Sequence, residues 1–354
     1  MAAKQRKKAQ KRSVCSIILA AGKGTRIGLT KTHKTCLPVG GRPVIVRSLE
    51  AYAAAGVSPH VVVVGTGAQH VLQTVGSPAW GGIPDAAFAY QPEPLGTGNA
   101  AKYGVSVLRS LDYDGDILVV AGDKLVDVKI VREMIRMFQS SRLDCLLLVG
   151  PRQLSPDSGR VIFDEKGLPV AVVETADIRR ARVLSQILEN VDEGLLSPDF
   201  VAQAISTEGL PPEKARRAFG ALYDFSTRAV HLTQDEVIRE ISQRGTSFKV
   251  PLGKRSERIS PEEADSAEYV NLSLYLVKME ALDFAVGKIK PDNAQGEEYL
   301  TDIVEILAGA KQGGRRRFAL ATLLTDDPHL VMGFNNLDEL RVIESHIREK
   351  QGWP

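Results

Sequence analysis

The feature that most constrains the fold of this chain is the alternation, through its first half, of short apolar runs with segments of helical periodicity. The apolar runs have the length of strands and cover residues 14–20, 61–64, 86–90, 117–121 and 145–149. Apolar residues at helical spacing separate these runs, at residues 44–55, 98–108 and 128–138. This alternation is typical of βαβ units, so it predicts an α/β fold built on a mostly parallel sheet. Because each run is apolar throughout, we expect these strands to lie centrally in the sheet.

The pattern changes after this first half. Residues 161–163 and 170–173 are apolar and flank the turn-forming segment 164–167, which predicts a hairpin. Residues 270–277 form another apolar run of strand length. We therefore expect the sheet to be completed by strands from the second half of the chain.

The segment between these strand patterns, residues 179–267, is charged and helical instead. Thr233 and Glu236 form a capping box, and Pro198 and Pro212 each stand beside an acidic residue in a first helical turn. This pattern predicts an inserted, mainly helical subdomain. The complete predicted division is a basic flexible tail at 1–12, a domain formed by 13–178 and 268–354, and the insertion at 179–267.

Length and charge limit the function classes. With 354 residues, the chain exceeds the roughly 250–300 residues that one hydrophobic core supports, which fits a large domain with an insertion. Six of the 45 basic side chains lie in residues 1–12, where no acidic residue occurs, so the remaining chain is net acidic. A net acidic body argues against general nucleic-acid binding, since such binding needs clustered Lys and Arg. We interpret the tail as a solvated leader, and contact of the tail alone with nucleic acid stays open.

Cysteine usage and hydropathy indicate the compartment. The three cysteines, Cys15, Cys36 and Cys145, have no CxxC spacing, so we expect no disulfide and a reducing environment. No apolar run approaches the roughly 18 residues that a membrane span needs. We therefore expect a cytoplasmic protein without a membrane partner.

The histidines do not predict a metal site. The chain has six, at positions 33, 60, 70, 231, 329 and 346, and none has the spacing of a metal-binding motif. We expect them at the surface or at helix caps.

The strongest functional signal directly follows the first apolar run. Residues 19–26 read Leu-Ala-Ala-Gly-Lys-Gly-Thr-Arg, and their small side chains let backbone N–H groups surround a polyphosphate. Arg26 closes the segment and Lys34 follows eight residues later, so two fixed cations are available for the phosphates. The segment matches neither the Walker loop nor the Gly-x-Gly-x-x-Gly fingerprint of dinucleotide sites. The alternative is a glycine-rich turn with a structural role only.

A second signal is a carboxylate at the end of a predicted strand. Asp123 follows the run 117–121, at the carboxyl edge where open α/β sheets bind their ligands. A carboxylate there suits Mg²⁺, which prefers oxygen ligands and completes its shell with water and phosphate. The alternative is an N-cap for the helix that starts near Asp127.

Six segments of the chain resemble, in the same order, the motifs of the sugar-1-phosphate nucleotidyltransferases. They are residues 19–26, 34–43, 91–100, 122–123, 293–302 and 333–336. The chain is most similar to the uridylyltransferase domain of bacterial N-acetylglucosamine-1-phosphate uridylyltransferases, over about residues 14–177 and 268–345. The resemblance implies a Rossmann-like, GT-A-like nucleotidyltransferase fold, with a mixed, mostly parallel sheet flanked by helices and a helical insertion.

The resemblance also implies a role for each matching residue. The nucleotide phosphates would contact Leu19, Ala20, Ala21, Gly22, Gly24 and Thr25, and the catalytic residues would be Arg26, Lys34 and Asp123. The uracil base would be read by Gln91, Gly96 and Thr97. The alternative for Gln91 is a side chain at the end of a loop, in solvent. Mg²⁺ would be held by Asp123 and Asn335, the second of which would otherwise be read as a turn residue. The sugar phosphate would contact Gly159, Glu174, Asn271, Glu297, Tyr299 and Thr301.

The implied reaction is attack of a sugar-1-phosphate, similar to N-acetylglucosamine-1-phosphate, on the α-phosphorus of UTP, giving a UDP-sugar and pyrophosphate. A phosphate monoester is largely dianionic near pH 7, so no side-chain base is needed. Catalysis then consists of alignment and charge neutralisation by Mg²⁺ and the two cations.

The chain departs from the family pattern at three places. Lys124 and Leu125 follow Asp123 where the family has an apolar residue and proline. Asn271 is followed by Leu-Ser instead of Thr-Gly, and the insertion falls beside the predicted sugar pocket. Another nucleotide, a non-sugar phosphate acceptor and a non-catalytic nucleotide-sugar sensor therefore stay open. The sequence contains no hexapeptide-repeat acetyltransferase domain, so we expect no acetyl transfer.

Overall fold

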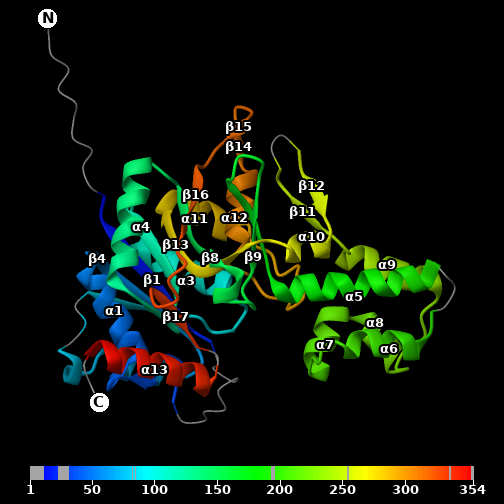
Figure 1. Ribbon diagram of the computed structural model, residues 1–354, viewed down its shortest axis with the longest axis horizontal. Coiled ribbons are helices and arrows are strands. Elements are labelled where there is room, and N and C mark those ends of the chain that lie inside the picture. The colour runs from blue at the N-terminus through cyan, green and yellow to red at the C-terminus, as the bar shows by residue number, and fades with distance from the viewer. Residues whose placement is uncertain are drawn as a thin grey trace, which may run out of the picture.

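A nine-stranded mixed sheet forms the centre of this computed structural model, which describes residues 12–22, 32–81, 83, 85–192, 196–252, 255–334 and 336–351 (Figure 1). The strand order is β10-β9-β13-β6-β1-β4-β5, and β8 pairs with both β13 and β16. The strands are β1 (Val14–Ala20), β4 (Val57–Val64), β5 (Ala86–Tyr90), β6 (Asp116–Ala121), β8 (Cys145–Pro151), β9 (Arg160–Phe163), β10 (Pro169–Val173), β13 (Tyr269–Lys278) and β16 (Leu320–Leu324). The expected mixed, mostly parallel sheet is confirmed.

One half of the sheet, β6-β1-β4-β5, is entirely parallel. The chain runs from β1 to β4 and β5 on one side, and then returns to place β6 on the other side of β1. The order therefore reverses between β1 and β6, which is the position where open α/β sheets bind ligands. In the register of this pair Leu19 lies opposite Ala121, so the segments after both strands begin side by side.

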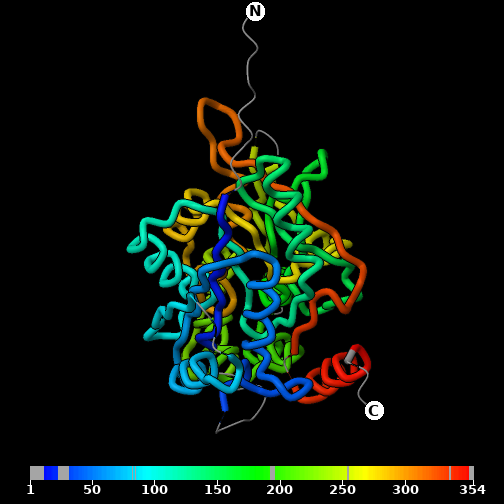
Figure 2. The backbone as a smooth tube through the Cα atoms, turned by 90° about the vertical axis from the view of Figure 1, so that its left-hand side faces the viewer, coloured from blue at the N-terminus to red at the C-terminus, as the bar shows by residue number. Residues whose placement is uncertain are grey.

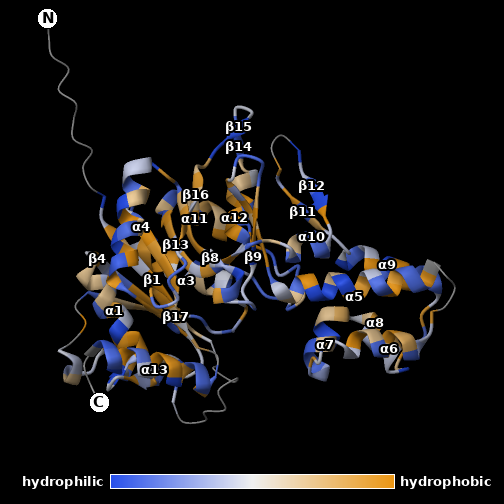
Figure 3. Ribbon diagram, in the orientation of Figure 1, coloured by the Kyte–Doolittle hydropathy of each residue, from blue (hydrophilic) through white to orange (hydrophobic). Residues whose placement is uncertain are grey.

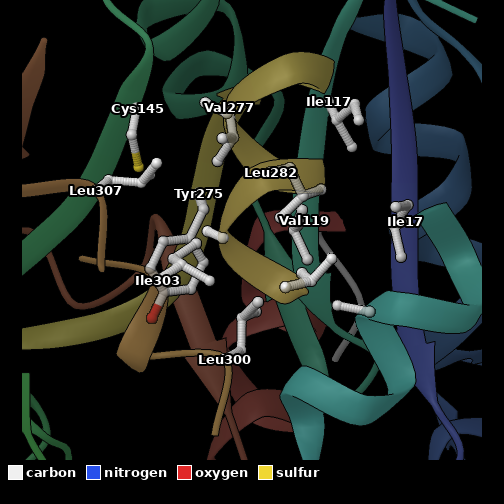
Figure 4. Packing of buried hydrophobic residues seen from close by; sticks show 14 of the residues in the cluster. Ile17, Ile117, Val119, Cys145, Tyr275, Val277, Leu282, Leu300, Ile303 and Leu307 are labelled. Carbon is white, nitrogen blue, oxygen red and sulfur yellow. The ribbon is translucent and has the colours of Figure 1, made fainter. Parts of the chain in front are cut away.

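Helices cover both faces of the sheet. One face packs against α1 (Val44–Ala54), α2 (Ala68–Val75) and α4 (Val128–Ser141), and the other against α3 (Thr97–Ser110), α11 (Met279–Val286) and α12 (Asp302–Gly309). Successive residues of β1 point to opposite faces, so Ile17 packs into one hydrophobic core and Ile18 into the other. Figure 4 shows the first core, where Val119 of β6 lies beside Leu282 of α11 and Ile17 lies on the neighbouring strand β1. Figure 3 shows that hydrophobic residues concentrate in the strands.

The predicted strands and helices of the first half are present, with one correction. The run 86–90 forms β5 with the expected bounds, but this strand pairs only with β4 among the described strands and lies at the edge of the sheet. Tyr90 at its end is 60% exposed. The expectation of a central position was wrong for β5, because an apolar run can also arise where helices cover the faces of an edge strand. The predicted hairpin is confirmed as β9 and β10, which are antiparallel.

Among its described residues, the charged middle segment contains helices α5 to α9, which lie beside the sheet, on the right in Figure 1. They are α5 (Thr175–Asp192), α6 (Pro198–Ser206), α7 (Pro212–Phe219), α8 (Ala221–Ser226) and α9 (Gln234–Arg244). The predicted helix starts are confirmed, including the capping box of Thr233 with Glu236. These helices share a hydrophobic core of their own, which includes Leu184, Phe219 and Val237. The exact domain boundaries stay a prediction.

Two further elements follow the helices before the sheet resumes. A short hairpin of β11 (Phe248–Val250) and β12 (Glu257–Ile259), which the sequence pattern did not indicate, precedes α10 (Pro261–Asp265).

The last part of the chain returns to the carboxyl edge of β6. The strand β7 (Lys124–Val126) pairs antiparallel with β17 (Val331–Gly333), so that Gly333 lies opposite Lys124. The terminal helix α13 (Leu337–Gln351) packs near β2 (Pro38–Val39), at the end of the molecule opposite the β14–β15 hairpin in Figures 1 and 2. The remaining elements are the 3-10 turns η2 (Lys34–Cys36), η3 (Pro78–Trp80) and η4 (Arg152–Leu154), and the strands β3 (Arg42–Pro43), β14 (Lys311–Gln312) and β15 (Arg315–Arg316).

Two expectations about the environment can be compared with the structure. Cys15, Cys36 and Cys145 are buried and unpaired, as expected. Among the helices of the described residues, none has both the length and the apolar character that crossing a bilayer requires.

Candidate active site

The segments that follow the four parallel strands gather at one edge of the sheet. Ala21 and Gly22 follow β1, Gly65 follows β4, Gln91 follows β5, and Gly122 follows β6. The glycines allow close approach: a Cβ at Gly65 would lie 2.8 Å from the carbonyl oxygen of Ala21, and a Cβ at Gly122 would lie 3.0 Å from that of Leu19. This packing brings the predicted phosphate-binding, base-binding and metal-binding segments to the same edge.

The described part of the phosphate-binding turn ends at Gly22. Leu19 is half-buried, Ala20 and Ala21 are buried, and Gly22 is exposed, with open space where a side chain would lie. Gly22 itself is therefore accessible to solvent. The predicted residues Gly24, Thr25 and Arg26 lie outside the described residues.

Lys34 and Asp123 form an ion pair although 89 positions separate them in the sequence. Lys34 opens η2, and Asp123 directly follows the end of β6. Burial alone would raise the pKa of Asp123, but the positive charges of Lys34 and Lys124 hold this pKa below its ordinary value. Asp123 is therefore a carboxylate at neutral pH.

The capping alternative for Asp123 is excluded. The N-cap of α4 is Asp127, whose side chain accepts a hydrogen bond of 2.9 Å from the backbone N–H of Lys129. The strand β7 lies between Asp123 and this helix.

His33 connects the phosphate-binding turn to Lys34, a role that sequence reasoning missed. Its Nε2 lies 2.8 Å from the carbonyl oxygen of Gly22, and its Nδ1 lies 2.9 Å from Oγ1 of Thr35. Only an N–H can bond to a carbonyl, so Nε2 donates and Nδ1 accepts, which makes His33 the N-cap of η2. Burial lowers the pKa of His33, so the ring is neutral at pH 7.

The outcome for the histidines is mixed. His33 is a cap, as expected, whereas the expectation of a surface position was wrong for His60. This side chain is buried, with its Nδ1 2.8 Å from Oγ of Ser16. His60 lies on the inner strand β4, where an apolar pattern tolerates a polar residue that has a buried partner.

The predicted base-reading residues lie together. Gln91 is buried, and its Nε2 donates to the carbonyl oxygen of Gly96 at 3.2 Å and to Oδ1 of Asn99 at 2.9 Å. The reading of Gln91 as a solvent-exposed loop residue is therefore excluded. Thr97 begins α3, and its Oγ1 accepts from the backbone N–H of Leu300 at 3.0 Å.

Glu298 links the residues around Gln91 to the segment of residues 293–302. Its Oε2 accepts from Asn99 at 3.0 Å and from Lys102 at 2.7 Å, two residues that the sequence analysis did not single out. Gly96 has a positive φ of 111°, and a Cβ there would lie 2.5 Å from the carbonyl oxygen of Glu298. The neighbouring Glu297 is half-buried, and its own Cβ would lie 3.0 Å from that added atom. Because of this positive φ and these close contacts, a side chain would not fit at position 96.

The predicted sugar-phosphate residues form a second cluster. Oγ1 of Thr301 donates to Oε1 of Glu174 at 2.9 Å, and the backbone N–H of Asn271 donates to the carbonyl oxygen of Gly159 at 2.9 Å. Gly159 also faces Glu174, because a Cβ there would lie 3.2 Å from Oε1 of that residue. Tyr299 is buried, and its hydroxyl has no hydrogen-bond partner within the described residues.

Carboxylates crowd around this second cluster. Burial, and then the charge of Asp177, raises the pKa of Glu174 to about 6, against a hydrogen bond from Thr301 that lowers it. Burial, followed by the charges of Asp177, Glu305 and Glu174, raises the pKa of Asp302 to about 7. Asp177 itself pairs with Arg180 at 3.5 Å. The cluster therefore has an excess of negative charge.

The segment of residues 293–300 connects both clusters to the inserted helices. The backbone N–H of Ala294 donates to Oδ1 of Asp177 in α5 at 2.6 Å, and Nη1 of Arg217 in α7 donates to the carbonyl oxygen of Gln295 at 3.3 Å. At its other end the segment contacts α3 through Glu298 and Leu300. The insertion therefore touches the candidate site directly.

The residues present at the predicted metal site are compatible with a divalent cation. Asp123 offers a carboxylate at the sheet edge, and Mg²⁺ needs only one or two carboxylates when phosphate and water supply its other ligands. Asn335, the second predicted ligand, lies outside the described residues. Within the described part of the chain, no three His, Cys, Asp or Glu side chains gather closely enough to hold a metal by themselves.

A parallel α/β sheet that reverses its strand order beside a glycine turn, a lysine and a carboxylate defines a nucleotide-binding class of protein. The family model described as "MobA-like NTP transferase domain" matches residues 16–195, and the chain belongs to this family. The match confirms the resemblance to nucleotidyltransferases that the motifs indicated.

Curated relatives extend this similarity. The bifunctional protein GlmU of Pelotomaculum thermopropionicum is 27% identical over 338 residues, which cover 95% of this chain and 52% of the relative. The bifunctional protein GlmU of Pelobacter propionicus is 35% identical over 168 residues, or 47% of this chain and 34% of the relative. The chain thus spans about half the length, or less, of these relatives.

A solved structure supports the fold. It is a putative glucose-1-phosphate thymidylyltransferase from Bacillus anthracis in complex with a sucrose, with a TM-score of 0.55 and 14% identity. The similarity covers 95% of this chain and 96% of that one. At this identity the likeness concerns the arrangement of the sheet and helices.

Proposed function

We propose that this protein transfers a uridylyl group from UTP to a sugar-1-phosphate similar to N-acetylglucosamine-1-phosphate, giving a UDP-sugar and pyrophosphate. The observation that carries the proposal is the meeting of the Gly22 turn, Lys34 and Asp123 at one sheet edge, where His33 links the first two. Membership in a family of NTP transferases supports the same reaction class.

In the proposed nucleotide site, the main chain of residues 19–25 holds the phosphates, and Gln91, Gly96 and Thr97 surround the base. Both N–H groups of the Gln91 amide are already used by Gly96 and Asn99, so only its carbonyl oxygen is left for the base. An acceptor at this position favours a base with a ring N–H, such as uracil or thymine. It disfavours cytosine, whose ring nitrogen is itself an acceptor.

In the proposed transfer step, an oxygen of the acceptor phosphate attacks the α-phosphorus in line and pyrophosphate leaves. Arg26 and Lys34 stabilise the negative charge on the leaving group, and Asp123 and Asn335 would hold Mg²⁺, which supplies further neutralisation of phosphate charge. Lys34 is paired with Asp123 in the structure. If Asp123 held the metal, the ammonium of Lys34 would be available to a phosphate.

In the proposed acceptor site, Glu174, Asn271 and Thr301 bind the sugar hydroxyls, with Gly159, Glu297 and Tyr299 completing the pocket. The hydroxyl of Tyr299, which has no hydrogen-bond partner among the described residues, and the Glu174–Thr301 pair supply donors and acceptors of the kind that select sugar hydroxyls.

One observation favours a second acceptor class. In addition to the effect of burial, the charge of Asp177 raises the pKa of Glu174, and the charges of Asp177 and Glu174 raise the pKa of Asp302. A neutral sugar ring does not offset this excess of negative charge, whereas the phosphate ester of an amino alcohol would place a cation there. The second candidate reaction is therefore nucleotidyl transfer to such a phosphate.

The test is a substrate panel with release of pyrophosphate as the readout. UTP, dTTP, CTP, GTP and ATP are each combined with N-acetylglucosamine-1-phosphate, glucose-1-phosphate and phosphocholine in the presence of Mg²⁺. We expect the highest kcat/KM for UTP with N-acetylglucosamine-1-phosphate. Binding of UTP without release of pyrophosphate from any pair would contradict the proposal and favour a nucleotide-sugar sensor.

The proposal extends to domain organisation and compartment. Residues 13–178 and 268–354 would form the catalytic domain and residues 179–267 the insertion, which is supported by the separate hydrophobic core of helices α5 to α9. A cytoplasmic, reducing environment is supported by the three unpaired cysteines.

A further inference from the structure

Lys124 is a cation of the candidate site that has no assigned role. It directly follows Asp123 and opens β7, and its backbone carbonyl accepts a hydrogen bond of 2.8 Å from Oγ of Ser48. The Lys124 residue is half-buried. Within the described residues, its ammonium makes no ion pair and no hydrogen bond, although it lies close enough to Asp123 to act on that carboxylate.

The side chain of Lys124 has a defined path across the facing strand. A Cβ at Gly333, its partner in the β7–β17 ladder, would lie 2.7 Å from Nζ, 2.8 Å from Cδ and 3.0 Å from Cε. Gly333 does not have a positive φ, so its backbone does not require glycine. The absence of a side chain at position 333 instead makes room for the stem of Lys124.

Among the described residues, the charges around Lys124 are not balanced. Asp123 is the nearest carboxylate along the chain, and it is already neutralised by its ion pair with Lys34. Two ammonium groups therefore act on one carboxylate, and one positive charge remains. A half-buried ammonium without a counter-ion is unfavourable unless an anion binds there.

We propose that Lys124 is an additional fixed cation of the catalytic site, which binds a phosphoryl oxygen of the reacting substrates. This inference rests on the proposed function, because the anion is taken to be a phosphate of the nucleotide or of the acceptor. Both sources offer the same chemistry, and separate KM values distinguish them. Lys124 would act in addition to Lys34, whose ion pair with Asp123 the structure describes.

The first experiment measures anion binding without turnover or metal. The affinity for inorganic pyrophosphate is determined by calorimetry in EDTA for the wild type, Lys124→Met and Lys124→Arg. We expect the Kd to rise about tenfold or more in Lys124→Met, as for the loss of a hydrogen bond between charged groups, and to rise less in Lys124→Arg. Lys166→Met is the matched control, since Lys166 is an exposed lysine in the turn between β9 and β10.

A second variant tests the path of the side chain. The methyl group of Gly333→Ala would displace the end of Lys124, so this change should raise the Kd for pyrophosphate by a smaller factor. In the Lys124→Met background the same change should have no further effect, because the displaced ammonium is absent. Equal effects of Gly333→Ala in both backgrounds would overturn the assigned path.

The third measurement separates the two substrates. A rise in the KM of UTP alone in Lys124→Met assigns the ammonium to the nucleotide, and a rise in the KM of the sugar phosphate alone assigns it to the acceptor. A pyrophosphate Kd and KM values equal to those of Lys166→Met would overturn the proposal. The calorimetric result does not depend on turnover, so failure of the proposed reaction and failure of the Lys124 assignment are distinguishable.

Discussion

Replacement of His33 by asparagine tests whether the link between the Gly22 turn and Lys34 supports turnover. Nε2 of His33 bonds to the carbonyl oxygen of Gly22 at 2.8 Å, which the shorter asparagine side chain does not reach, whereas asparagine still caps η2. The lost hydrogen bond is worth about 1 kcal/mol of folding stability, or about 2–4 °C in the melting temperature. A displacement of about 1 Å at a catalytic group can lower turnover about 100-fold. We therefore expect kcat to fall about 10- to 100-fold with only a small change in melting temperature.

The assay is continuous release of pyrophosphate with the best substrate pair, combined with thermal melting of each variant. His70→Asn is the matched control, because His70 is an exposed histidine on α2 close to His33. His33→Ala removes the cap as well and should cost about 1 kcal/mol more stability. A wild-type kcat in His33→Asn would refute the positioning role, because this variant lacks the bond to Gly22.

Four further outcomes follow from the geometry and the pKa shifts. Asp123→Ala is expected to abolish pyrophosphate release in Mg²⁺, and retained activity would remove its metal role. Because the pKa of Glu174 is raised from 4.5 to about 6, its ionisation lowers the folding stability as pH rises through this window. Glu174→Gln should therefore be more stable than the wild type by up to about 2 kcal/mol at pH 8 and equally stable below pH 4.5. An equal gain in stability at both pH values in denaturant titrations would contradict this. The pKa of His60 is lowered to about 4, so the neutral ring stabilises the fold fully above pH 6.5, and this stabilisation is lost as pH falls toward 4. His60→Gln should therefore make the free energy of unfolding depend less on pH on the acid side. An unchanged pH dependence would contradict this role of His60. Gly96→Ala should cost at least about 1–3 kcal/mol from backbone strain alone, measured by urea unfolding, and wild-type stability would show that the contact with Glu298 relaxes freely.

Helices and strands were predicted well from the sequence where a single local pattern, such as an apolar run or a capping box, determines the element. The run 14–20 became β1 with the expected bounds, because an apolar segment ending in small residues and glycine has few alternatives. The capping box at Thr233 likewise marked the start of α9. The edge position of β5 was missed, because hydropathy reports burial on two faces and says nothing about whether a second neighbouring strand exists.

The candidate site was less accessible to sequence reasoning. The pairing of Lys34 with Asp123 depends on the neighbouring positions of β1 and β6, which no local pattern specifies, so their association rested on the motif resemblance. The role of His33 was missed because a single histidine before a lysine has no distinctive spacing. The sequence did mark Lys124 as unusual, because the family that the chain resembles has an apolar residue at this position.

The segment of residues 293–300 joins the proposed base site to the proposed acceptor site. Asp177 at the start of α5 and Arg217 of α7 bind its first part, while Asn99 and Lys102 of α3 bind Glu298 near its end. We therefore expect an amino-acid change in this segment to alter binding at both proposed sites. Engineering a new acceptor preference would therefore require compensating changes on α3, so that choice of nucleotide is not lost with the old acceptor.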